Sequence, residues 1–388
     1  MGVRTVCCGF FLLSLARLAA FGQLRPGDAA EVGMSRARLD RASEMLEAEV
    51  RLRGVNAASI LVSRRGTIVL HKGFGHLSSE AGSPAVGPDS IYVVGSITKT
   101  VTATALMILV DRGKVSLNEP VSTYLPEFTG GERKKVRVLD LLAHTSGLPD
   151  QLPENIQLRQ AHAPISEFLK HVYTTPLLFT PGTAYSYQSM GILLAATIVE
   201  KVSGMSIQDF ERKEIFEPLG MIHSSLGPGK YRLADTVQVQ VGNETDMQAF
   251  HNWGQNSAYW RGLGDPWGDL DTTTTDLAIL LQTLLNGGTN GRKRLLGPMT
   301  VRAMISNQNS HLNAPWGLGW ELGNSQNKYL GDLVSPTAFG HPGSPGTLEW
   351  ADPETQVICI VLTCRPLVVD NALFLRRVSN VVAAAVEK

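Results

Sequence analysis

The chain has 388 residues, 43% of them hydrophobic and 18% charged, which is the balance of a globular protein with one large domain or two ordinary ones. Its 35 basic and 35 acidic residues cancel, and no basic block stands out. Because nucleic-acid binders need a concentrated positive charge, we expect no nucleic-acid partner.

The first 22 residues have the pattern of a secretory signal peptide. Arg4 precedes an apolar run at 6–15, and a small-x-small sequence precedes Gln23. Arg17 interrupts the apolar stretch, which argues against a membrane-spanning helix of about 20 residues. We predict an exported protein, periplasmic or secreted, with no membrane span in the mature chain. The alternative is an uncleaved amphipathic segment.

A helix and a β-hairpin are predicted next along the chain. Ser35 is a candidate cap for a helix over about 36–50, where apolar residues recur on one stripe. Two β-rich runs, 59–63 and 67–71, flank a glycine-containing turn and predict a hairpin.

The middle of the chain is richer in helical periodicity, and the tail returns to strands. Strand patterns occur at 346–351 and 356–363, and a helix is predicted over 371–387. Cys359 and Cys364 are five residues apart in the second of these strands, so their side chains point to opposite faces and do not pair. We expect both cysteines to be small buried residues.

This order of elements predicts an α/β fold of the α+β type, with an antiparallel sheet flanked by helices. We assign residues 23–388 to a single catalytic domain. Its α/β lobe is expected at about 31–95 and 287–388, and a mostly helical lobe is inserted at about 96–286. Residues 233–267 are aromatic-rich and weakly periodic, and they fit a cleft wall or ordinary surface packing equally well.

The sequence Gly95-Ser96-Ile97-Thr98-Lys99-Thr100 leads into an apolar helical run. A serine at a helix start and a lysine three residues later share one face, and the helix N-terminus favours developing negative charge. Burial favours a neutral amine, so Lys99 can accept the proton of Ser96. A second Ser-x-x-Lys sequence, at Ser325 and Lys328, lies in a polar stretch without a helix and is interpreted as chance.

With its neighbouring motifs, the chain resembles the β-lactamase-related serine hydrolases. This family includes class C β-lactamases, penicillin-binding D,D-peptidases, and related esterases and D-aminopeptidases. The resemblance covers about residues 35–388, with the motifs in the expected order. Besides the Ser-x-x-Lys sequence, these motifs are the hairpin 59–75, Leu-Leu-Ala-His-Thr-Ser-Gly-Leu-Pro at 141–149, Pro-Gly-Thr-Ala-Tyr-Ser-Tyr at 181–187, Trp-Gly-Leu-Gly-Trp at 316–320 and His-Pro-Gly-Ser-Pro-Gly at 341–346.

The resemblance implies a β-lactamase/transpeptidase-like fold and a proton-transfer role for Tyr187. In relatives this tyrosine lies beside the serine and the lysine and passes a proton to the leaving group. A nearby ammonium would favour tyrosinate character and make Tyr187 a base; a core tyrosine is the alternative. Ser189 replaces the family asparagine that touches the substrate's amide side chain, which argues against β-lactam or peptide recognition.

His341-Pro342-Gly343 stands where β-lactamases have Lys-Thr-Gly. The resemblance places His341 near Tyr187 or against a substrate carboxylate, with a charge that depends on pH; a structural histidine is the alternative. Gly343 would let the strand approach the substrate closely. The backbone N–H of Ser344 would join that of Ser96 as the oxyanion hole.

Other catalytic classes lack their motifs. His144 lies in a segment that the family uses as a structural turn, so we build no Ser-His triad on it. The chain has no Gly-x-Ser-x-Gly elbow, His-Glu-x-x-His pair, phosphate-binding loop or Gly-x-Gly-x-x-Gly fingerprint. We therefore expect no metal and no cofactor.

The leading hypothesis is acyl transfer to water through Ser96 on an ester, an amide or a D-amino-acid peptide. Within this class we favour an esterase or peptidase over an efficient β-lactamase. The alternatives are a non-turnover penicillin- or peptidoglycan-binding or sensing protein and a structural surface domain. We expect Ser96 at the junction of the two lobes, where clefts usually form, and we make no prediction of oligomeric state.

Overall fold

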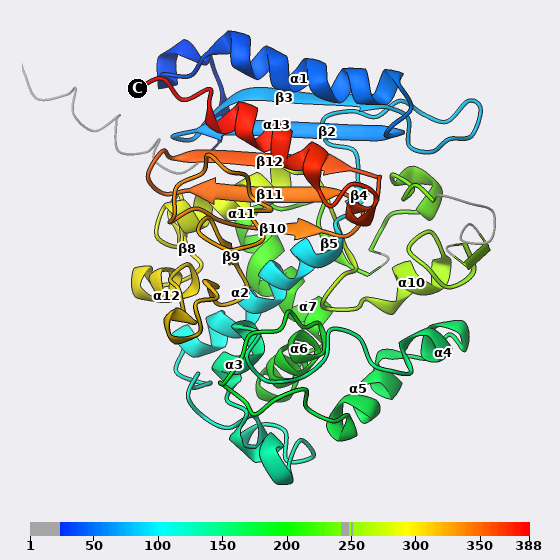
Figure 1. The fold of residues 1–388 in the computed structure, drawn as a ribbon, viewed down its shortest axis with the longest axis vertical. Coiled ribbons are helices and arrows are strands. Elements are labelled where there is room, and N and C mark those ends of the chain that lie inside the picture. The colour runs from blue at the N-terminus through cyan, green and yellow to red at the C-terminus, as the bar shows by residue number, and fades with distance from the viewer. Residues whose placement is uncertain (1–23, 228, 242–247, 250) are drawn as a thin grey trace, which may run out of the picture.

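The computed structural model describes residues 24–227, 229–241, 248–249 and 251–388, so the predicted signal peptide lies outside the described residues. Its main element is a seven-stranded sheet built from both ends of the chain, in the order β1-β3-β2-β12-β11-β10-β9 (Figure 1). The strands are β1 (Arg25–Pro26), β2 (Ala57–Arg64), β3 (Thr67–Gly75), β9 (Glu321–Leu322), β10 (Phe339–Gly343), β11 (Thr347–Asp352) and β12 (Val357–Thr363). All neighbours pair antiparallel except β1 with β3, which confirms the predicted antiparallel sheet.

The predicted hairpin is present in this sheet as β2 and β3. Arg65 and Gly66 connect β2 to β3 with φ of 50° and 78°, the positive φ values that a tight two-residue hairpin turn needs. β2 then pairs with β12, with Leu61 opposite Ile360, and so joins residues from the two ends of the chain. Every residue of β2 and β12 is buried, because helices cover both faces of the sheet.

Two terminal helices cover one face of the sheet, α1 (Arg36–Arg51) and α13 (Leu373–Ala383) (Figure 1). They bury Leu39 from α1 and Val378 from α13 in an apolar cluster with β2, β11 and β12. Ser35 precedes α1 but makes no side-chain capping bond; its backbone N–H donates to Ala385 O at 2.8 Å. The two ends of the chain are therefore held to each other as well as to the sheet.

The opposite face of the sheet carries α11 (Thr274–Leu285), which contacts β2, β11 and β12. Farther from the sheet, α2 (Thr98–Asp111) packs against α6 (Met190–Ser203) inside the second, larger apolar cluster. Other α-helices that lie wholly within the described residues are α3 (Val138–Leu142), α4 (Asn155–Gln160), α5 (Ile165–Thr174), α7 (Ile207–Glu211), α8 (Glu217–Leu219), α10 (Ala258–Leu263) and α12 (Pro298–Met304). Short strands form two small sheets, β4 (Tyr92–Val93) with β5 (Ser225–Leu226) and β6 (Leu270–Thr272), and β7 (Thr289–Asn290) with β8 (Lys293–Arg294).

Among the described residues, no single helix is long and apolar enough to cross a membrane. One bent pair of helices, Met190–Ser203 with Ile207–Leu219, is long and apolar enough only when the two helices are taken together.

Candidate active site

Ser96 lies in a tight turn between β4 and α2. The turn is a short 3-10 helix, Gly95–Ile97, that runs directly into α2 at Thr98. Gly95 has φ of 58°, and a Cβ there would lie 2.5 Å from Pro345 Cδ and 3.0 Å from the backbone N of Ser344. The turn therefore packs against the end of β10 so closely that only glycine fits beside Ser96.

Lys99 occupies the first turn of α2 and is 1% exposed. Its Nζ lies 3.0 Å from Ser96 Oγ and donates to the carbonyl of Trp267 at 2.9 Å. Burial lowers the pKa of Lys99 to about 8, while the carboxylates of Asp150 and Asp265 oppose that shift. A substantial fraction of the amine is therefore neutral near pH 8 and can accept the Ser96 proton.

Tyr187 precedes α6, and its ring centroid lies 4.9 Å from Lys99 Nζ. Its hydroxyl is buried and forms no hydrogen bond of normal geometry with the described residues. Burial raises the pKa of Tyr187 well above its ordinary value, an effect that the nearby Ser96 hydroxyl only partly offsets. Burial therefore favours the protonated phenol at Tyr187 over the tyrosinate that an adjacent ammonium would favour.

His144 packs behind Tyr187, with ring centroids 4.7 Å apart, and against Trp316 at 4.9 Å. Its Nδ1 accepts the backbone N–H of Gln188 at 3.3 Å. Burial, and next the charge of Lys99, lower the pKa of His144 well below its ordinary value. His144 thus holds the tyrosine loop in place as a neutral side chain and does not line the catalytic cavity.

His341 lies on β10 and is 1% exposed, with its ring centroid 5.8 Å from that of Tyr187. Its Nδ1–H donates to the carbonyl of Pro342 at 2.6 Å. Burial and the nearby Lys99 lower the pKa of His341 to about 3. The ring is therefore neutral at physiological pH and offers no positive charge to a substrate carboxylate.

Gly343 ends β10 at the closest approach between the sheet and the Ser96 turn. A Cβ there would lie 2.0 Å from Val94 O and 2.1 Å from Thr347 Oγ1, and that hydroxyl donates to Val94 O at 2.8 Å. This packing brings the backbone of Ser344 beside Ser96. The arrangement suits an oxyanion hole made of two backbone N–H groups.

Ser189 is buried, and its Oγ donates to Asp150 Oδ1 at 2.5 Å. Between Tyr187 and Ser189, the buried Gln188 side chain donates to the carbonyl of Asp140 at 3.0 Å. Asp150 lines the cavity beside Ser96, and Ser189 does not. Ser189 therefore orients a carboxylate at the site where relatives present an asparagine.

The cavity at Ser96 has a volume of about 590 Å³. The structure brings four of the predicted site residues to it: Ser96, Tyr187, His341 and Ser344. Its other walls are Asp150, Gln255, Trp316, Glu321, Asn327, Tyr329, Pro342, Pro366, Leu367, Val368 and Asn371. Asp150 and Glu321 were not predicted as site residues. Asp150 directly follows the Leu-Leu-Ala-His-Thr-Ser-Gly-Leu-Pro motif, and Glu321 directly follows the Trp-Gly-Leu-Gly-Trp motif.

Glu321 is fully buried in the wall of this cavity, and burial raises its pKa to about 7. Ser325, the serine of the second Ser-x-x-Lys sequence, donates its hydroxyl to Glu321 Oε1. Lys328 donates its Nζ to the carbonyl of Gly323 at 3.0 Å. The second sequence thus supports a cavity wall and forms no serine–lysine pair.

The aromatic-rich segment 233–267 contributes to the site and to packing. Gln255 lines the cavity, and the carbonyl of Trp267 accepts from Lys99. Trp260 packs instead under the Arg159 guanidinium, 3.6 Å from the ring centroid. The segment therefore forms part of the cavity wall at Gln255 and packs against the protein at Trp260, which are the two interpretations that the sequence left open.

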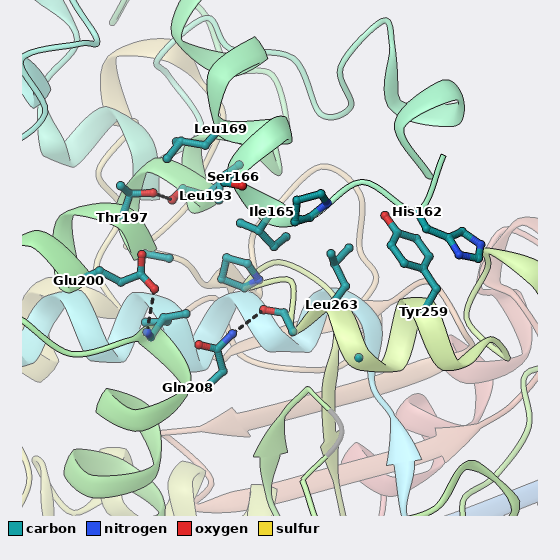
Figure 2. A pocket seen from close by; sticks show the side chains of 16 residues that line it. His162, Ile165, Ser166, Leu169, Leu193, Thr197, Glu200, Gln208, Tyr259 and Leu263 are labelled. Carbon is teal, nitrogen blue, oxygen red and sulfur yellow. Dashed lines mark hydrogen bonds between the residues drawn. The ribbon is translucent and has the colours of Figure 1, made fainter. Parts of the chain in front are cut away.

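A second pocket of about 490 Å³ lies between α5, α6 and α10, apart from Ser96 (Figure 2). Figure 2 shows its polar side chains already bonded within the protein: Glu200 accepts the Ile207 N–H at 3.0 Å, and Gln208 donates to the Gly264 carbonyl at 3.4 Å. His162 and Tyr259 stack with ring centroids 4.5 Å apart.

Known proteins match both the sequence and the fold. The sequence model of the family described as "Beta-lactamase" matches residues 42–377. A relative from Salmonella agona (strain SL483), named "Putative D-alanyl-D-alanine carboxypeptidase", is 28% identical over 396 residues, covering 94% of this chain and 90% of the relative.

Two solved structures share the fold. A penicillin-binding protein homologue from Caulobacter crescentus has a TM-score of 0.74 at 24% identity, covering 91% of this chain and 98% of the homologue. A family VIII carboxylesterase has a TM-score of 0.73 at 20% identity, covering 91% of this chain and 98% of the esterase. These likenesses confirm the fold that the sequence motifs predicted.

Proposed function

The chain belongs to the beta-lactamase family and is a serine hydrolase, and from this premise we propose that it hydrolyses esters and amides through a covalent acyl-enzyme on Ser96. One observation carries the proposal. The Lys99 amine lies 3.0 Å from Ser96 Oγ, and its pKa is lowered to about 8 by burial. A base of this strength, in contact with a hydroxyl at a helix start, can activate that hydroxyl for attack.

In the acylation step, Ser96 Oγ attacks the substrate carbonyl carbon while the neutral Lys99 amine accepts the hydroxyl proton. The carbonyl oxygen becomes an oxyanion, which the two backbone N–H groups beside it stabilise. The Tyr187 phenol gives its proton to the leaving group, and the Lys99 ammonium returns one to Tyr187. The bond to the leaving group breaks, and an ester remains on Ser96.

In the deacylation step, a water molecule attacks this ester and Lys99 accepts the water proton. The tetrahedral intermediate collapses, Ser96 leaves and takes the proton back, and the free acid is released. Ester substrates are favoured over β-lactams and peptides because Ser189, in place of asparagine, is bonded to Asp150 and offers no amide to the substrate.

Intact-protein mass after a fluorophosphonate and, separately, a penicillin tests the nucleophile. We expect one adduct on the wild type and none on Ser96→Ala. Ser325→Ala is the matched control, because its serine also precedes a lysine by three residues but bonds to Glu321, so labelling is retained. Adduct formation on folded Ser96→Ala would contradict the assignment.

The same experiment separates an enzyme from a binding or sensing protein. An enzyme releases the acyl group, so the penicillin adduct decays and an ester substrate gives many equivalents of product. A non-turnover protein gives one equivalent, and its adduct persists. Absence of any adduct on folded wild-type protein would contradict the acyl-enzyme.

A further inference from the structure

Lys99 is bound by a turn that begins at Asp265. The Trp267 carbonyl accepts the Lys99 amine at 2.9 Å, and the Pro266 carbonyl accepts the Thr102 hydroxyl at 2.7 Å. Lys99 and Thr102 are three residues apart on α2 and share one face of that helix. Two consecutive carbonyls of the turn therefore bind the helix face that carries the catalytic amine.

Asp265 folds this turn, which covers residues 265–269. Its backbone carbonyl accepts the N–H groups of Gly268 at 3.3 Å and Asp269 at 3.2 Å. Its side chain lies over the same turn, since a Cβ on Gly268 would lie 3.1 Å from Asp265 Oδ1. Asp265 is 0% exposed and does not line the catalytic cavity. Its effect on the reaction must therefore pass through the turn and Lys99.

Arg159 of α4 forms an ion pair with this carboxylate. Arg159 is 2% exposed, and its Nη2 lies 3.7 Å from Asp265 Oδ2. Its Nε also donates to Asn155 Oδ1 at 3.1 Å, and its guanidinium lies 3.6 Å from the centroid of the Trp260 ring. Because a guanidinium keeps its charge at any ordinary pH, the buried Arg159 requires the Asp265 carboxylate as a counter-charge.

The pair is incompletely hydrogen-bonded. Neither carboxylate oxygen of Asp265 forms a hydrogen bond of normal geometry among the described residues, and Arg159 Nη1 has no partner there. A buried ion pair with unpaired atoms contributes little to stability, and apolar side chains often replace such a pair without loss. Its place, two residues before the carbonyl that binds Lys99, points instead to a role at the active site.

The Asp265 carboxylate and the Lys99 amine act on each other's charge. Burial raises the pKa of Asp265, whereas Arg159 and then Lys99 oppose that rise. Burial lowers the pKa of Lys99 to about 8, whereas Asp150 and Asp265 oppose that fall. Two further ionisable groups face Asp265, namely Asp269 and Tyr259.

The remaining ionisable groups around Lys99 are ones whose uncharged form burial favours: Tyr187, His144 and His341. The charge that favours the Lys99 ammonium therefore comes from the carboxylates of Asp150 and Asp265. Loss of the Asp265 charge would lower the pKa of Lys99 further.

We propose that Asp265, with Arg159 as its counter-ion, is a positioning residue for the catalytic lysine. The carboxylate keeps the turn folded, so that the Trp267 carbonyl holds the amine beside Ser96. The neutral amine donates to that carbonyl, which leaves its lone pair free to accept the Ser96 proton. This inference rests on the proposed acyl-enzyme function and adds to it a residue that acts from outside the cavity.

Asp265→Asn tests the proposal, because it keeps the side-chain size and removes the charge. On a neutral p-nitrophenyl ester, we expect kcat to fall at least about tenfold while KM changes little, since Asp265 positions Lys99 and does not line the cavity. The midpoint of the pH profile of kcat/KM should move to lower pH by at least about half a unit, because the ammonium loses an opposite charge. An unchanged midpoint in folded protein, or a move to higher pH, would overturn the proposal.

A double variant separates this effect from misfolding, because Asp265→Asn alone leaves Arg159 buried without its counter-charge. Arg159→Met combined with Asp265→Asn replaces the ion pair by uncharged side chains of similar size, a change that buried pairs often tolerate. The midpoint should again move to lower pH, since Asp265 is the member of the pair that acts on Lys99. A wild-type midpoint in the folded double variant would overturn the proposal, whatever the single variant does.

Asp269→Asn is the matched control. Asp269 is 0% exposed in the same turn and accepts the Gly264 N–H at 2.8 Å, but the charges that act on it include those of Asp265 and Arg261 and not that of Lys99. Its replacement should leave the midpoint at the wild-type pH, even where the rate falls. A shift equal to that of Asp265→Asn would show that disturbance of the turn moves the profile, and would overturn the role of the Asp265 charge.

Failure of this inference and failure of the proposed function give different results. If the fluorophosphonate labels Ser96 of the wild type and the Asp265 variants keep its pH midpoint, the positioning role is wrong and the acyl-enzyme stands. If folded wild-type protein is not labelled at Ser96, the acyl-enzyme is wrong, and the positioning role falls with it.

Discussion

At the residue scale, burial favours the protonation states that the proposed mechanism needs at Lys99 and Tyr187. The same apolar surroundings lower the pKa of the Lys99 amine and raise that of the Tyr187 phenol, because burial disfavours the charged form of each group. At neutral pH the lysine can accept a proton and the tyrosine can donate one. The two roles follow from one environment.

Activity should therefore rise with pH as Lys99 loses its proton. For a neutral ester, we expect kcat/KM to increase about tenfold per pH unit below pH 8 and to level off above it, since the deprotonated amine is the active form and its pKa is about 8. Initial rates from pH 6 to 9, corrected with Ser96→Ala, measure this profile. A rate that falls as the pH rises through 8 would contradict Lys99 as the base.

Replacement of Tyr187 should depend on the leaving group. Tyr187→Phe removes the donor, so hydrolysis of an alkyl ester should slow by about 10²–10⁴-fold. A p-nitrophenyl ester should slow less, because p-nitrophenolate departs without protonation. Steady-state kinetics on both esters with the same acyl chain test this. Equal losses would mean that the phenol positions the substrate and donates no proton.

The Ser96–Lys99 pair could be predicted from the sequence because three residues on a helix fix the contact locally. Asp150 and Glu321 could not, because they reach the cavity through the packing of distant segments. Ser189 shows the same limit of prediction from local sequence. Its position two residues after Tyr187 follows from the motif, but its hydrogen bond to Asp150 joins segments 39 residues apart.

At the element scale, the geometry of the site depends on Gly343 at the end of β10 and Gly95 in the turn before α2, where the two segments meet. The long hydrophobic strands β2, β11 and β12 were predicted from their composition. No periodicity indicated β10, because it contains Gly340, Pro342 and Gly343, which strands generally avoid. Its place in the sheet comes from pairing with β11, a tertiary contact that strand propensity does not encode.

Gly343→Ala should separate β10 from the Ser96 turn. Its Cβ would lie within 2.1 Å of both Val94 O and Thr347 Oγ1, so the strand end must move and the oxyanion hole must open. We expect Ser96 labelling to slow at least tenfold and the melting temperature to fall. Gly262→Ala is the control, since nothing lies within 4 Å of its Cβ. Normal labelling of Gly343→Ala would show that this close contact does not set the active-site geometry.

At the scale of the whole molecule, the catalytic turn and the terminal helices depend on one sheet. The outer face of that sheet is covered by α1 and α13, which come from opposite ends of the chain (Figure 1). Loss of either helix exposes β2 and β12, and β12 pairs with β11, the neighbour of β10. Unfolding of the sheet should therefore remove activity in the same transition.

Leu39→Ala tests this coupling. Leu39 belongs to α1 and is 0% exposed in the apolar cluster between that helix and the sheet, so its truncation should cost about 2–5 kcal/mol of unfolding free energy. Leu52→Ala is the control, because Leu52 is 74% exposed and should change stability by no more than about 0.5 kcal/mol. Urea unfolding followed by circular dichroism and by ester hydrolysis should give the same midpoint in each protein. Activity lost well before the sheet signal would mean that the site unfolds independently.

Cys359 and Cys364 are buried and free, as predicted, so their reactivity toward an alkylating reagent reports local opening of the structure. Burial raises the pKa of the Cys364 thiol to about 11 and that of Cys359 further still, so neither presents a thiolate to an alkylating reagent in the folded protein. Cys359 becomes reactive only when β12 leaves the centre of the sheet, whereas Cys364, which directly follows β12, becomes reactive when its contact with Gln240 opens. The alkylation rates of the two peptides that contain them therefore measure, without any substrate, how often the sheet and its adjoining segment open.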